Sequence, residues 1–399
     1  MTRTGAIPSG LAVIGATGSV GGAVLDVCRS FPNRFHVSAL SSLGNVSRMA
    51  ALANEFAPEL VSMCDPEAAA SLKPLVPPGT RVLSGLDSLT EVSLFPGSSH
   101  VVFASSGTAA IPALMAALEA GKPVSLANKE SLVIAGPWVM PLVGSKDQMR
   151  PLDSEHNAVW QCLSGEMDRS IQSIVLTASG GPFRALGTRE LERVTPKMAL
   201  RHPVWAMGAK ITVDSATLMN KGLEILEAMQ LFRLPAGKVR ALVHPQSFVH
   251  GMVLFSDCTM KWLLSNPDMR IPAAVALAYP ERLQIKDVAL EFPPLETLAL
   301  SFEEPDLNRF PCLSIAMEAA RTGGAAPALL VGADEIAVKA FLEERLPFTA
   351  IPRLIEEVLT SYPGPSPTSA EEAIAIMEWS KRKAMETLYP EKSSRRSVP

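Results

Sequence analysis

Two carboxylates, Asp153 and Glu155, stand two residues apart, directly after the short apolar and basic run 149–152. If this run ends as an extended strand, side chains at i and i+2 point to the same side, so both carboxylates can reach one point. Paired carboxylate oxygens without a nearby thiolate suit Mg²⁺ or Mn²⁺ better than zinc. The alternative is a helix cap, with the acids in the first turn of a helix that begins at about His156. Taken alone, the segment favours the cap.

A second polar cluster lies at the start of a helix expected from about residue 217. Ser215, Asn220 and Lys221 can cradle a phosphate there, with Glu224 one turn deeper. The alternative is a solvated helix face, because polar residues recur there at i, i+4 and i+7. Gly222 argues against a plain solvated face, since glycine weakens a helix interior unless something packs close to it.

A glycine-rich turn follows the first expected strand. The apolar run Leu11–Ile14 leads into Gly15–Gly22, which has the spacing GxxGxxG, and a helical pattern comes next. In this context the backbone N–H groups can approach a pyrophosphate at the helix N-terminus. A glycine turn without a ligand is the alternative, but the placement favours a dinucleotide.

The second strand, Phe35–Leu40, is followed by Ser41–Asn45 and contains no acidic residue at its end. Folds that prefer NAD usually place an acid there for the ribose 2′-hydroxyl. Its absence, with Arg48 one turn further on, leaves room for a 2′-phosphate and favours NADP.

Strands and helices continue to alternate up to about residue 150, which predicts a parallel sheet with helices on both faces. Lys129 and Glu130 follow the strand Pro123–Leu126. The carboxyl ends of parallel strands are where such sheets bind ligands, so a substrate or cofactor role competes with a simple solvated ion pair.

Beyond residue 150 the elements are mixed. The strand Ser173–Thr177 leads into Ser179-Gly180-Gly181, which forms either an anion nest or only a turn. His202 and Trp205 belong to a loop that can either close over a site or anchor itself to the surface. Three further strands and four C-terminal helices are expected at Val239–Val243, Val249–Phe255, Thr259–Leu264, Leu313–Arg321, Glu335–Glu344, Ile351–Thr360 and Ala370–Met385.

These patterns predict an α/β chain with four regions: residues 1–150 as a Rossmann-like dinucleotide-binding domain, 151–283 as an α+β catalytic domain with a largely open sheet, 284–311 as a proline-rich linker, and 312–399 as a helical bundle. A length of 399 residues is too great for one ordinary core.

Composition excludes several classes of protein. A net charge of −4 gives no electrostatic basis for binding nucleic acid or an anionic membrane, and no apolar run is long enough to span a bilayer. Five scattered cysteines without a CxxC pair argue against a disulfide framework or a zinc site. The first residues lack the apolar core of a signal peptide. We expect a cytoplasmic protein.

Assembled in order, the motifs resemble the 1-deoxy-D-xylulose 5-phosphate reductoisomerase family along almost the whole chain. The stretches that carry the resemblance are 15–21, 126–131, 153–158, 179–183, 201–205, 214–224, 244–247 and 267–270. The resemblance implies NADPH- and metal-dependent isomerisation and reduction of 1-deoxy-D-xylulose 5-phosphate to 2-C-methyl-D-erythritol 4-phosphate, in the non-mevalonate route to isoprenoids, by a homodimer.

The resemblance also implies roles for particular residues. One divalent cation, Mg²⁺ or Mn²⁺, is expected on Asp153, Glu155 and Glu224. The substrate phosphate and hydroxyls are expected on Ser179, Ser215, Asn220 and Lys221 with His202 close by, the substrate backbone on Lys129 and Ser154, and Trp205 on a closing flap. NADPH is expected along Thr17, Gly18, Ser19, Val20, Gly44, Asn45, Asn128, Glu130 and Gly208.

The chain departs from the family pattern at three places. Leu43-Gly44 precede Asn45 where a Gly-Lys or Gly-Arg pair is usual, which leaves Arg48 as a substitute for the 2′-phosphate cation. Ala206 and Ala209 stand where Ser and Arg are frequent. The usual Asn-Ala-Ala-Asn-Glu run is replaced by the sequence from Val331 to Glu335, with Asp334 in place of the second asparagine.

Two other functions are compatible with these motifs. One is a dehydrogenase that uses the same metal and cofactor sites on another phosphosugar. The other is a non-catalytic dinucleotide sensor, which the loss of a metal carboxylate would favour; none is lost. NADPH oxidation with the expected substrate, with and without metal, separates the three.

Overall fold

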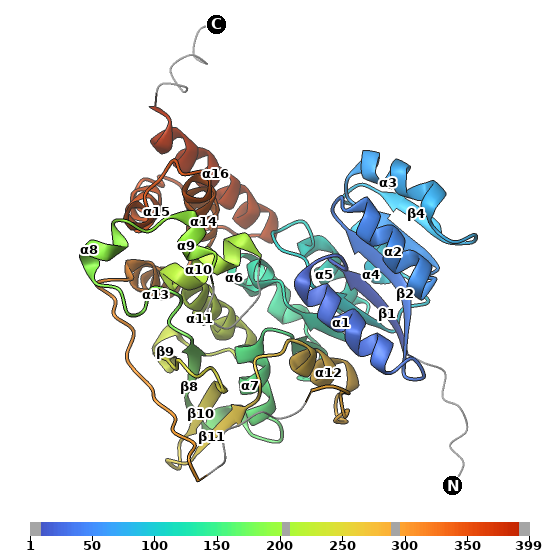
Figure 1. Cartoon of the computed structure of the whole chain (residues 1–399), viewed down its shortest axis with the longest axis horizontal. Coiled ribbons are helices and arrows are strands. Elements are labelled where there is room, and N and C mark those ends of the chain that lie inside the picture. The colour runs from blue at the N-terminus through green and yellow to red at the C-terminus, as the bar shows by residue number, and fades with distance from the viewer. Residues whose placement is uncertain (1–8, 202–207, 289–295, 391–399) are drawn as a thin grey trace, which may run out of the picture. The chain divides into compact units, whose positions relative to one another are not determined.

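The computed structural model describes residues 9–201, 208–288 and 296–390, and the chain divides into two compact units (Figure 1). The first unit combines Met1–Ser131, Val139–Gln161 and Asp268–Glu291. The second combines Leu132–Trp138, Cys162–Pro267 and Phe292–Pro399. None of the helices in the described ranges is both long and apolar enough to cross a bilayer.

The first unit is built on a seven-stranded parallel sheet in the order β4-β3-β2-β1-β5-β6-β7. The strands are β1 Ser9–Ile14, β2 Phe35–Ser42, β3 Leu60–Met63, β4 Arg81–Ser84, β5 His100–Phe103, β6 Val124–Leu126 and β7 Met149–Pro151. The strand order reverses between β1 and β5. A ligand of such a sheet binds outside the carboxyl ends of the strands at this switch point. The predicted parallel sheet is confirmed.

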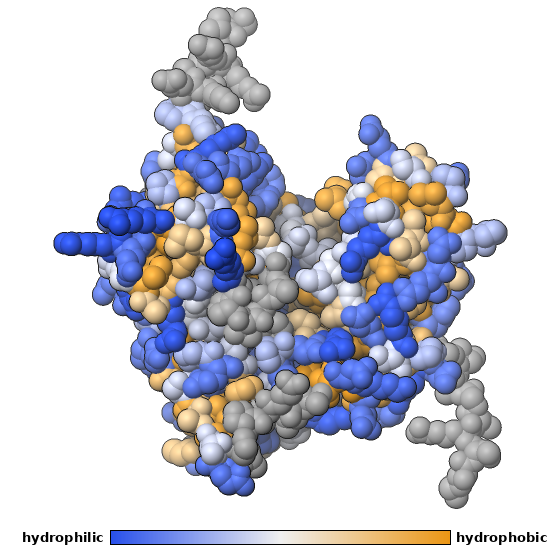
Figure 2. Space-filling view, in the orientation of Figure 1, coloured by the Kyte–Doolittle hydropathy of each residue, from blue (hydrophilic) through white to orange (hydrophobic). Residues whose placement is uncertain are grey.

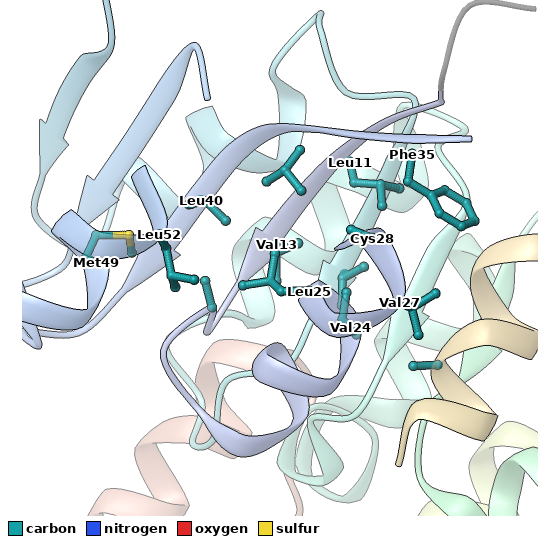
Figure 3. Close-up of a cluster of buried hydrophobic side chains, with 14 of the residues drawn as sticks. Leu11, Val13, Val24, Leu25, Val27, Cys28, Phe35, Leu40, Met49 and Leu52 are labelled. Carbon is teal, nitrogen blue, oxygen red and sulfur yellow. The ribbon is translucent and has the colours of Figure 1, made fainter. Parts of the chain in front are cut away.

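Helices connect the strands of this unit. They are α1 Ser19–Ser30, α2 Val46–Phe56, α3 Pro66–Leu72, α4 Ser88–Leu94, α5 Ile111–Glu119, α7 Ser154–Cys162 and α12 Arg270–Ala278, with short 3₁₀ turns at Lys73–Leu75 and Met140–Leu142. Helix α6, Lys129–Val139, starts in this unit, and its residues Leu132–Trp138 belong to the second unit. Figure 3 shows Leu11 and Val13 of β1 facing Val24 and Leu25 of α1 in the buried core. Burial on this scale contributes roughly 1.5–3 kcal/mol for each large apolar side chain.

Helix α12 packs against α1 and adds its buried alanines, Ala273, Ala274 and Ala276, to the core of the first unit. This helix was not predicted from the sequence, because an alanine-rich segment between two irregular stretches has little periodicity.

The second unit contains a four-stranded mixed sheet in the order β11-β10-β8-β9. The strands are β8 Ile171–Ala178, β9 Val239–Val243, β10 Val249–Phe255 and β11 Met260–Leu264. Strands β8 and β9 are parallel, and the other two pairings are antiparallel. The predicted open sheet is confirmed, and its strand bounds agree to within a few residues.

The helices of the second unit include four short or central ones and four C-terminal ones (Figure 1). They are α8 Thr188–Leu191, α9 Pro196–Ala199, α10 Ala209–Thr217, α11 Met219–Leu231, α13 Pro311–Thr322, α14 Ala326–Leu342, α15 Ile351–Thr360 and α16 Ala370–Leu388, with 3₁₀ turns at Asp168–Ser170, Ala236–Lys238 and Phe348–Ala350.

Helix α14 starts nine residues before the predicted Glu335. Its residues 328–334 are all buried, so this part lacks the one-sided apolar pattern by which a surface helix is recognised. Gly332 allows the close packing: a methyl group there would lie 2.4 Å from the Met377 carbonyl oxygen of α16.

Candidate functional site

The glycine turn after β1 is shaped by close backbone contacts. Gly15 has φ +86°, and a methyl group on it would lie 2.5 Å from the carbonyl carbon of Ala104, which follows β5. A methyl group on Gly21 would lie 2.3 Å from the Gly15 oxygen. Only glycine fits both positions. The predicted succession of strand, glycine turn and helix is confirmed, and the turn lies at the reversal of strand order.

Helix α1 begins at Ser19, and no side chain in the described residues caps its N-terminus. Gly18 and Ser19 are exposed, and Thr17 and Val20 are partly exposed. Unsatisfied N–H groups at a helix start bind anions and carry the positive end of the helix dipole. This arrangement fits a dinucleotide pyrophosphate.

The loop after β2 turns directly into α2. Asn45 caps this helix by accepting a hydrogen bond from the Arg48 N–H at 3.1 Å. Leu43 is 73% exposed and Gly44 is exposed beside it. The Arg48 guanidinium lies over α1, since a methyl group on Gly22 would be 3.2 Å from its Nη2. Within the described ranges this exposed guanidinium has no hydrogen bond or ion pair, so it is available to an anion.

The segment after β6 holds the start of α6. The Asn128 amide donates hydrogen bonds to the carbonyls of Ser105 and Gly107 at 2.9 and 2.8 Å, and its oxygen accepts from the Ser131 N–H and hydroxyl. Both polar atoms of the Asn128 side chain therefore form hydrogen bonds, which join the loop after β5 to the segment after β6. Glu130, in the first turn of α6, is partly buried.

Asp153 lies immediately before α7, and Glu155 lies in its first turn. One carboxylate oxygen of each lies within 4.8 Å of the other. Asp153 accepts a hydrogen bond from the Lys129 ammonium, and the Ser154 hydroxyl donates to Glu155. The two carboxylates therefore meet, but the helix begins at Ser154, so the assumption of an extended strand end was wrong.

The environment of Asp153 is nearly closed to solvent. The Lys129 and Asp153 side chains are 12% and 11% exposed, and Nδ1 of the fully buried His156 lies 3.7 Å from Asp153. A charge this buried stabilises the fold only with partners close to it. Oxygen donors of this kind suit Mg²⁺ or Mn²⁺, so the residues present fit a divalent cation as well as a helix cap.

In the second unit, the loop after β8 packs tightly against α10. Gly180 and Gly181 have φ +84° and +69°. A methyl group on Gly181 would lie 2.7 Å from the Ser215 carbonyl oxygen, and the Gly181 N–H donates to the Ser179 hydroxyl at 3.2 Å. Ser179 and Ser215, far apart in the sequence, are thus carried by segments in direct backbone contact.

Helices α10 and α11 are joined by Leu218, whose φ is +61°. The first turn of α11 then presents Asn220 and Lys221, and both donate hydrogen bonds to the Glu224 carboxylate, Asn220 at 2.6 Å. The Lys221 and Glu224 side chains are 4% and 1% exposed. The solvated helix face considered from sequence is therefore wrong.

Two further observations support a ligand site at the start of α11. The Asn220 Oδ1 is buried and has no hydrogen-bond partner in the described part of the chain, so it can accept a hydrogen bond from a ligand hydroxyl. Gly222 lies against α13: a methyl group on it would be 2.3 Å from Cβ of Ala316. This close contact is the packing reason for a glycine inside a helix.

His202 and Trp205 lie outside the described residues. Gly208 is exposed and occupies the N-cap position of α10. The predicted site residues fall in two groups. The residues around the glycine turn belong to the first unit, as do Lys129 and Asp153. The residues around Ser179, Ser215 and Glu224 belong to the second unit.

Comparison with known proteins gives one consistent result. The profile described as "1-deoxy-D-xylulose 5-phosphate reductoisomerase" matches residues 11–136, and two profiles for the C-terminal domains of that enzyme match 149–232 and 264–383. The proteins of this name from Prosthecochloris aestuarii and Desulfosudis oleivorans are 44% and 45% identical over 376 and 377 residues, which is 94% of this chain and 98% of each relative.

Solved structures agree. The reductoisomerase from Zymomonas mobilis in complex with NADPH is 37% identical, covers 96% of this chain and 99% of its own, and has a TM-score of 0.88. A reductoisomerase in complex with NADPH, fosmidomycin and magnesium is 36% identical, covers 95% of this chain and 98% of its own, and has a TM-score of 0.86.

Proposed function

The chain belongs to the 1-deoxy-D-xylulose 5-phosphate reductoisomerase family, and from this premise we propose which of its residues carry the reaction. The reaction is the NADPH- and divalent-metal-dependent isomerisation and reduction of 1-deoxy-D-xylulose 5-phosphate to 2-C-methyl-D-erythritol 4-phosphate, in the non-mevalonate isoprenoid pathway. The observation that carries this function is the match along 94% of the chain to relatives of that name.

Residues 1–150 bind NADPH, which supplies the hydride. Thr17, Gly18, Ser19 and Val20 hold the pyrophosphate with the uncapped N–H groups of α1. Gly44 and Asn45 line the ribose end, where Arg48 supplies the cation that the strand end lacks. The remaining cofactor contacts are made by Asn128, Glu130 and Gly208.

Asp153, Glu155 and Glu224 bind one Mg²⁺ or Mn²⁺. The cation supplies Lewis acidity, which polarises a substrate carbonyl and its neighbouring hydroxyl. Side chains of the chain orient these carboxylates: Lys129 holds Asp153, Ser154 holds Glu155, and the Asn220 amide holds Glu224. Such hydrogen-bonded support around ligand residues is typical of metal sites.

The substrate phosphate binds in the cradle formed by Ser179, Ser215, Asn220 and Lys221 (the phosphate cradle), with His202 nearby. Two hydroxyls, an amide and an ammonium at a helix N-terminus suit a phosphate dianion. Binding at a group remote from the reacting carbons orients the substrate for reaction. Lys129 and Ser154 contact the substrate backbone, and Trp205 helps exclude water from it.

By role, the chain divides into four regions. Residues 1–150 bind NADPH, residues 151–283 bind the metal and the substrate, residues 284–311 form a linker, and residues 312–399 form the helical region. This division is by proposed role, whereas the two compact units are defined by packing.

The protein acts as a homodimer in the cytoplasm. In support of a dimer, the edge strand β11 leaves Met260 and Trp262 49% and 47% exposed, and apolar surface is visible near this sheet (Figure 2). In support of a reducing compartment, the cysteines are free and three of them, Cys28, Cys162 and Cys312, are buried. Light scattering in solution tests the dimer: a monomer at micromolar concentration contradicts it.

The test of the function is NADPH oxidation with 1-deoxy-D-xylulose 5-phosphate, with product identification and with Mg²⁺, Mn²⁺ or a chelator. Turnover that requires metal and yields 2-C-methyl-D-erythritol 4-phosphate is expected. No turnover in either metal, with the folded protein confirmed, refutes the function. Turnover only with another phosphosugar supports the related dehydrogenase instead.

A further inference from the structure

Helix α14, in the C-terminal region of the chain, is joined to α10 by a charged contact. Lys210, in the first turn of α10, places its Nζ 2.6 Å from Oδ2 of Asp214 and 2.5 Å from Oδ2 of Asp334 on α14. Asp334 is fully buried, and the Asp214 side chain is 4% exposed. One ammonium therefore bridges a carboxylate of its own helix and a carboxylate of α14, and the two helices lie side by side (Figure 1).

The Lys210 ammonium stays charged throughout the working pH range, because its pKa is raised. Burial by itself lowers the pKa of Lys210, but Asp214 and Asp334 outweigh burial and raise the pKa above its ordinary value. Loss of Asp334 leaves a balanced Lys210–Asp214 pair within α10, whereas loss of Lys210 leaves two buried carboxylates without their cation. Replacing Asp334 therefore removes the charged contact between α10 and α14 and leaves Lys210 paired with Asp214.

The same α10 leads directly into the phosphate cradle. Ser215 follows Asp214, and α10 ends two residues later, where Leu218 turns the chain into α11. Helix α13 supports this junction by apolar packing, since a methyl group on Gly222 would lie 2.3 Å from Cβ of Ala316.

The contacts of α13 and α14 act differently. Apolar packing is non-directional and fixes the distance between helices better than their rotation or sliding. A charge-assisted hydrogen bond has a preferred direction and length, so it also fixes rotation and sliding. The Lys210–Asp334 bridge is such a directional contact between α10 and α14.

We propose that Asp334 is a positioning residue for the substrate phosphate: through Lys210 it holds α10 in the orientation that presents Ser215 to the cradle. This inference rests on the proposed function, because it assigns the cradle to the substrate phosphate. Asparagine keeps an oxygen that can accept from Lys210, so it is the conservative variant.

The test compares Asp334→Leu, which fills the volume without charge, with Asp334→Asn. The dissociation constant of inorganic phosphate is measured by calorimetry without turnover, and KM is measured for the substrate and for NADPH. For Asp334→Leu we expect phosphate affinity and substrate KM to worsen about tenfold, as for other supports of ligand residues. We expect KM for NADPH to stay within about twofold, and Asp334→Asn to restore most of the loss.

The matched control is Glu335→Gln. Glu335 is the next residue of α14, and its carboxylate pairs with Lys381 at 2.8 Å instead of with α10. This variant also removes one ion pair from the same helix, so it is expected to leave phosphate affinity and both KM values unchanged.

Several outcomes overturn the inference. Unchanged phosphate affinity in a folded Asp334→Leu variant assigns the bridge to stability alone, and an equal rise in KM for NADPH shows a general disturbance. If Asp334→Leu does not fold, Asp334→Asn and Asp334→Ser carry the test, with a loss expected for serine, which is too short to reach Lys210. A wild-type chain that binds no phosphate also overturns it, whereas phosphate binding without turnover refutes only the proposed function.

Discussion

The two proposed ligand-binding regions of this chain offer different chemical groups to their ligands. The glycine turn before α1 offers exposed backbone N–H groups, and its side chains are small. The phosphate cradle offers side chains, and its Lys221 and Glu224 are almost fully buried. A backbone site needs only the local turn to form, whereas buried charges need partners from distant segments to offset their desolvation.

This difference indicates which substitutions are expected to weaken each site. The glycine turn depends on contacts that one strand–turn–helix unit and its neighbouring strand provide. The cradle depends on the loop after β8 through Gly181, on α13 through Ala316 and on α14 through Asp334. Changes far from the ligand are therefore expected to affect the cradle more than the turn. Four predictions test this contrast, from the largest expected effect to the smallest.

The largest effect is expected from Asp153→Asn. The amide keeps the shape of the side chain but weakens metal binding, so turnover at limiting Mg²⁺ should fall by about a hundredfold or more. NADPH affinity should remain close to that of the wild type, because the glycine turn is untouched. Metal titration of activity and fluorescence titration of NADPH measure the two effects. Wild-type turnover at limiting metal would show that Asp153 is not a ligand.

Next comes Gly181→Ala, which brings a methyl group to within 2.7 Å of the Ser215 oxygen. We expect substrate KM to rise about tenfold and stability to fall by roughly 1–3 kcal/mol, because α10 must shift and the positive φ is strained. Gly165→Ala is the matched control: its φ is +80°, but nothing lies within 4 Å. A control variant that raises KM equally would assign the effect to backbone strain alone.

Arg48→Ala tests the cofactor side of the contrast. Removing the guanidinium that lies over Gly22 should lower the preference for NADPH over NADH by about tenfold, because a charged hydrogen bond contributes about 1.5–3 kcal/mol. The ratio of kcat/KM for the two cofactors measures it. Arg81→Ala, an exposed arginine of β4, is the control. If the preference is unchanged, the loop itself selects the 2′-phosphate.

The smallest effect on activity near neutral pH is expected from His100→Gln. His100 is a buried residue of the first unit, and its Nε2 lies 2.8 Å from the Ser125 hydroxyl. Burial, with a smaller contribution from Arg150, lowers the pKa of His100 to about 3. The folded state therefore favours neutral His100, and its contribution is complete above about pH 6.5 and is lost as the pH falls toward 3, by about 1.4 kcal/mol per pH unit.

Denaturant unfolding at several pH values measures this slope. His100→Gln should flatten it between about pH 6.5 and 4, whereas the exposed His36→Gln should not. Activity at neutral pH should be unaffected by His100→Gln, because the histidine supports the sheet and belongs to neither ligand site. An unchanged slope would contradict the assignment.

The amino-acid order by itself determined the features of this protein that depend on local geometry. Glycine spacing after an apolar run was enough to place the dinucleotide turn, and the absence of an acid at residues 41–45 was visible directly. The alternation of strands and helices was enough to predict the parallel sheet, because the hydrophobic periodicity of each strand or helix is contained within its own segment. The pair of carboxylates at Asp153 and Glu155 was also visible in the sequence.

Only the tertiary structure decided which alternatives were correct where burial mattered. The stripe of Asn220 and Glu224 has the same periodicity on a solvated face as on a buried one, and Ala316, from a distant helix, accounts for Gly222. The role of Asp334 could not be predicted, because its partner Lys210 lies far away in the sequence. Local patterns specify conformation, but the free energy of a buried charge depends on neighbours that only the folded chain brings together.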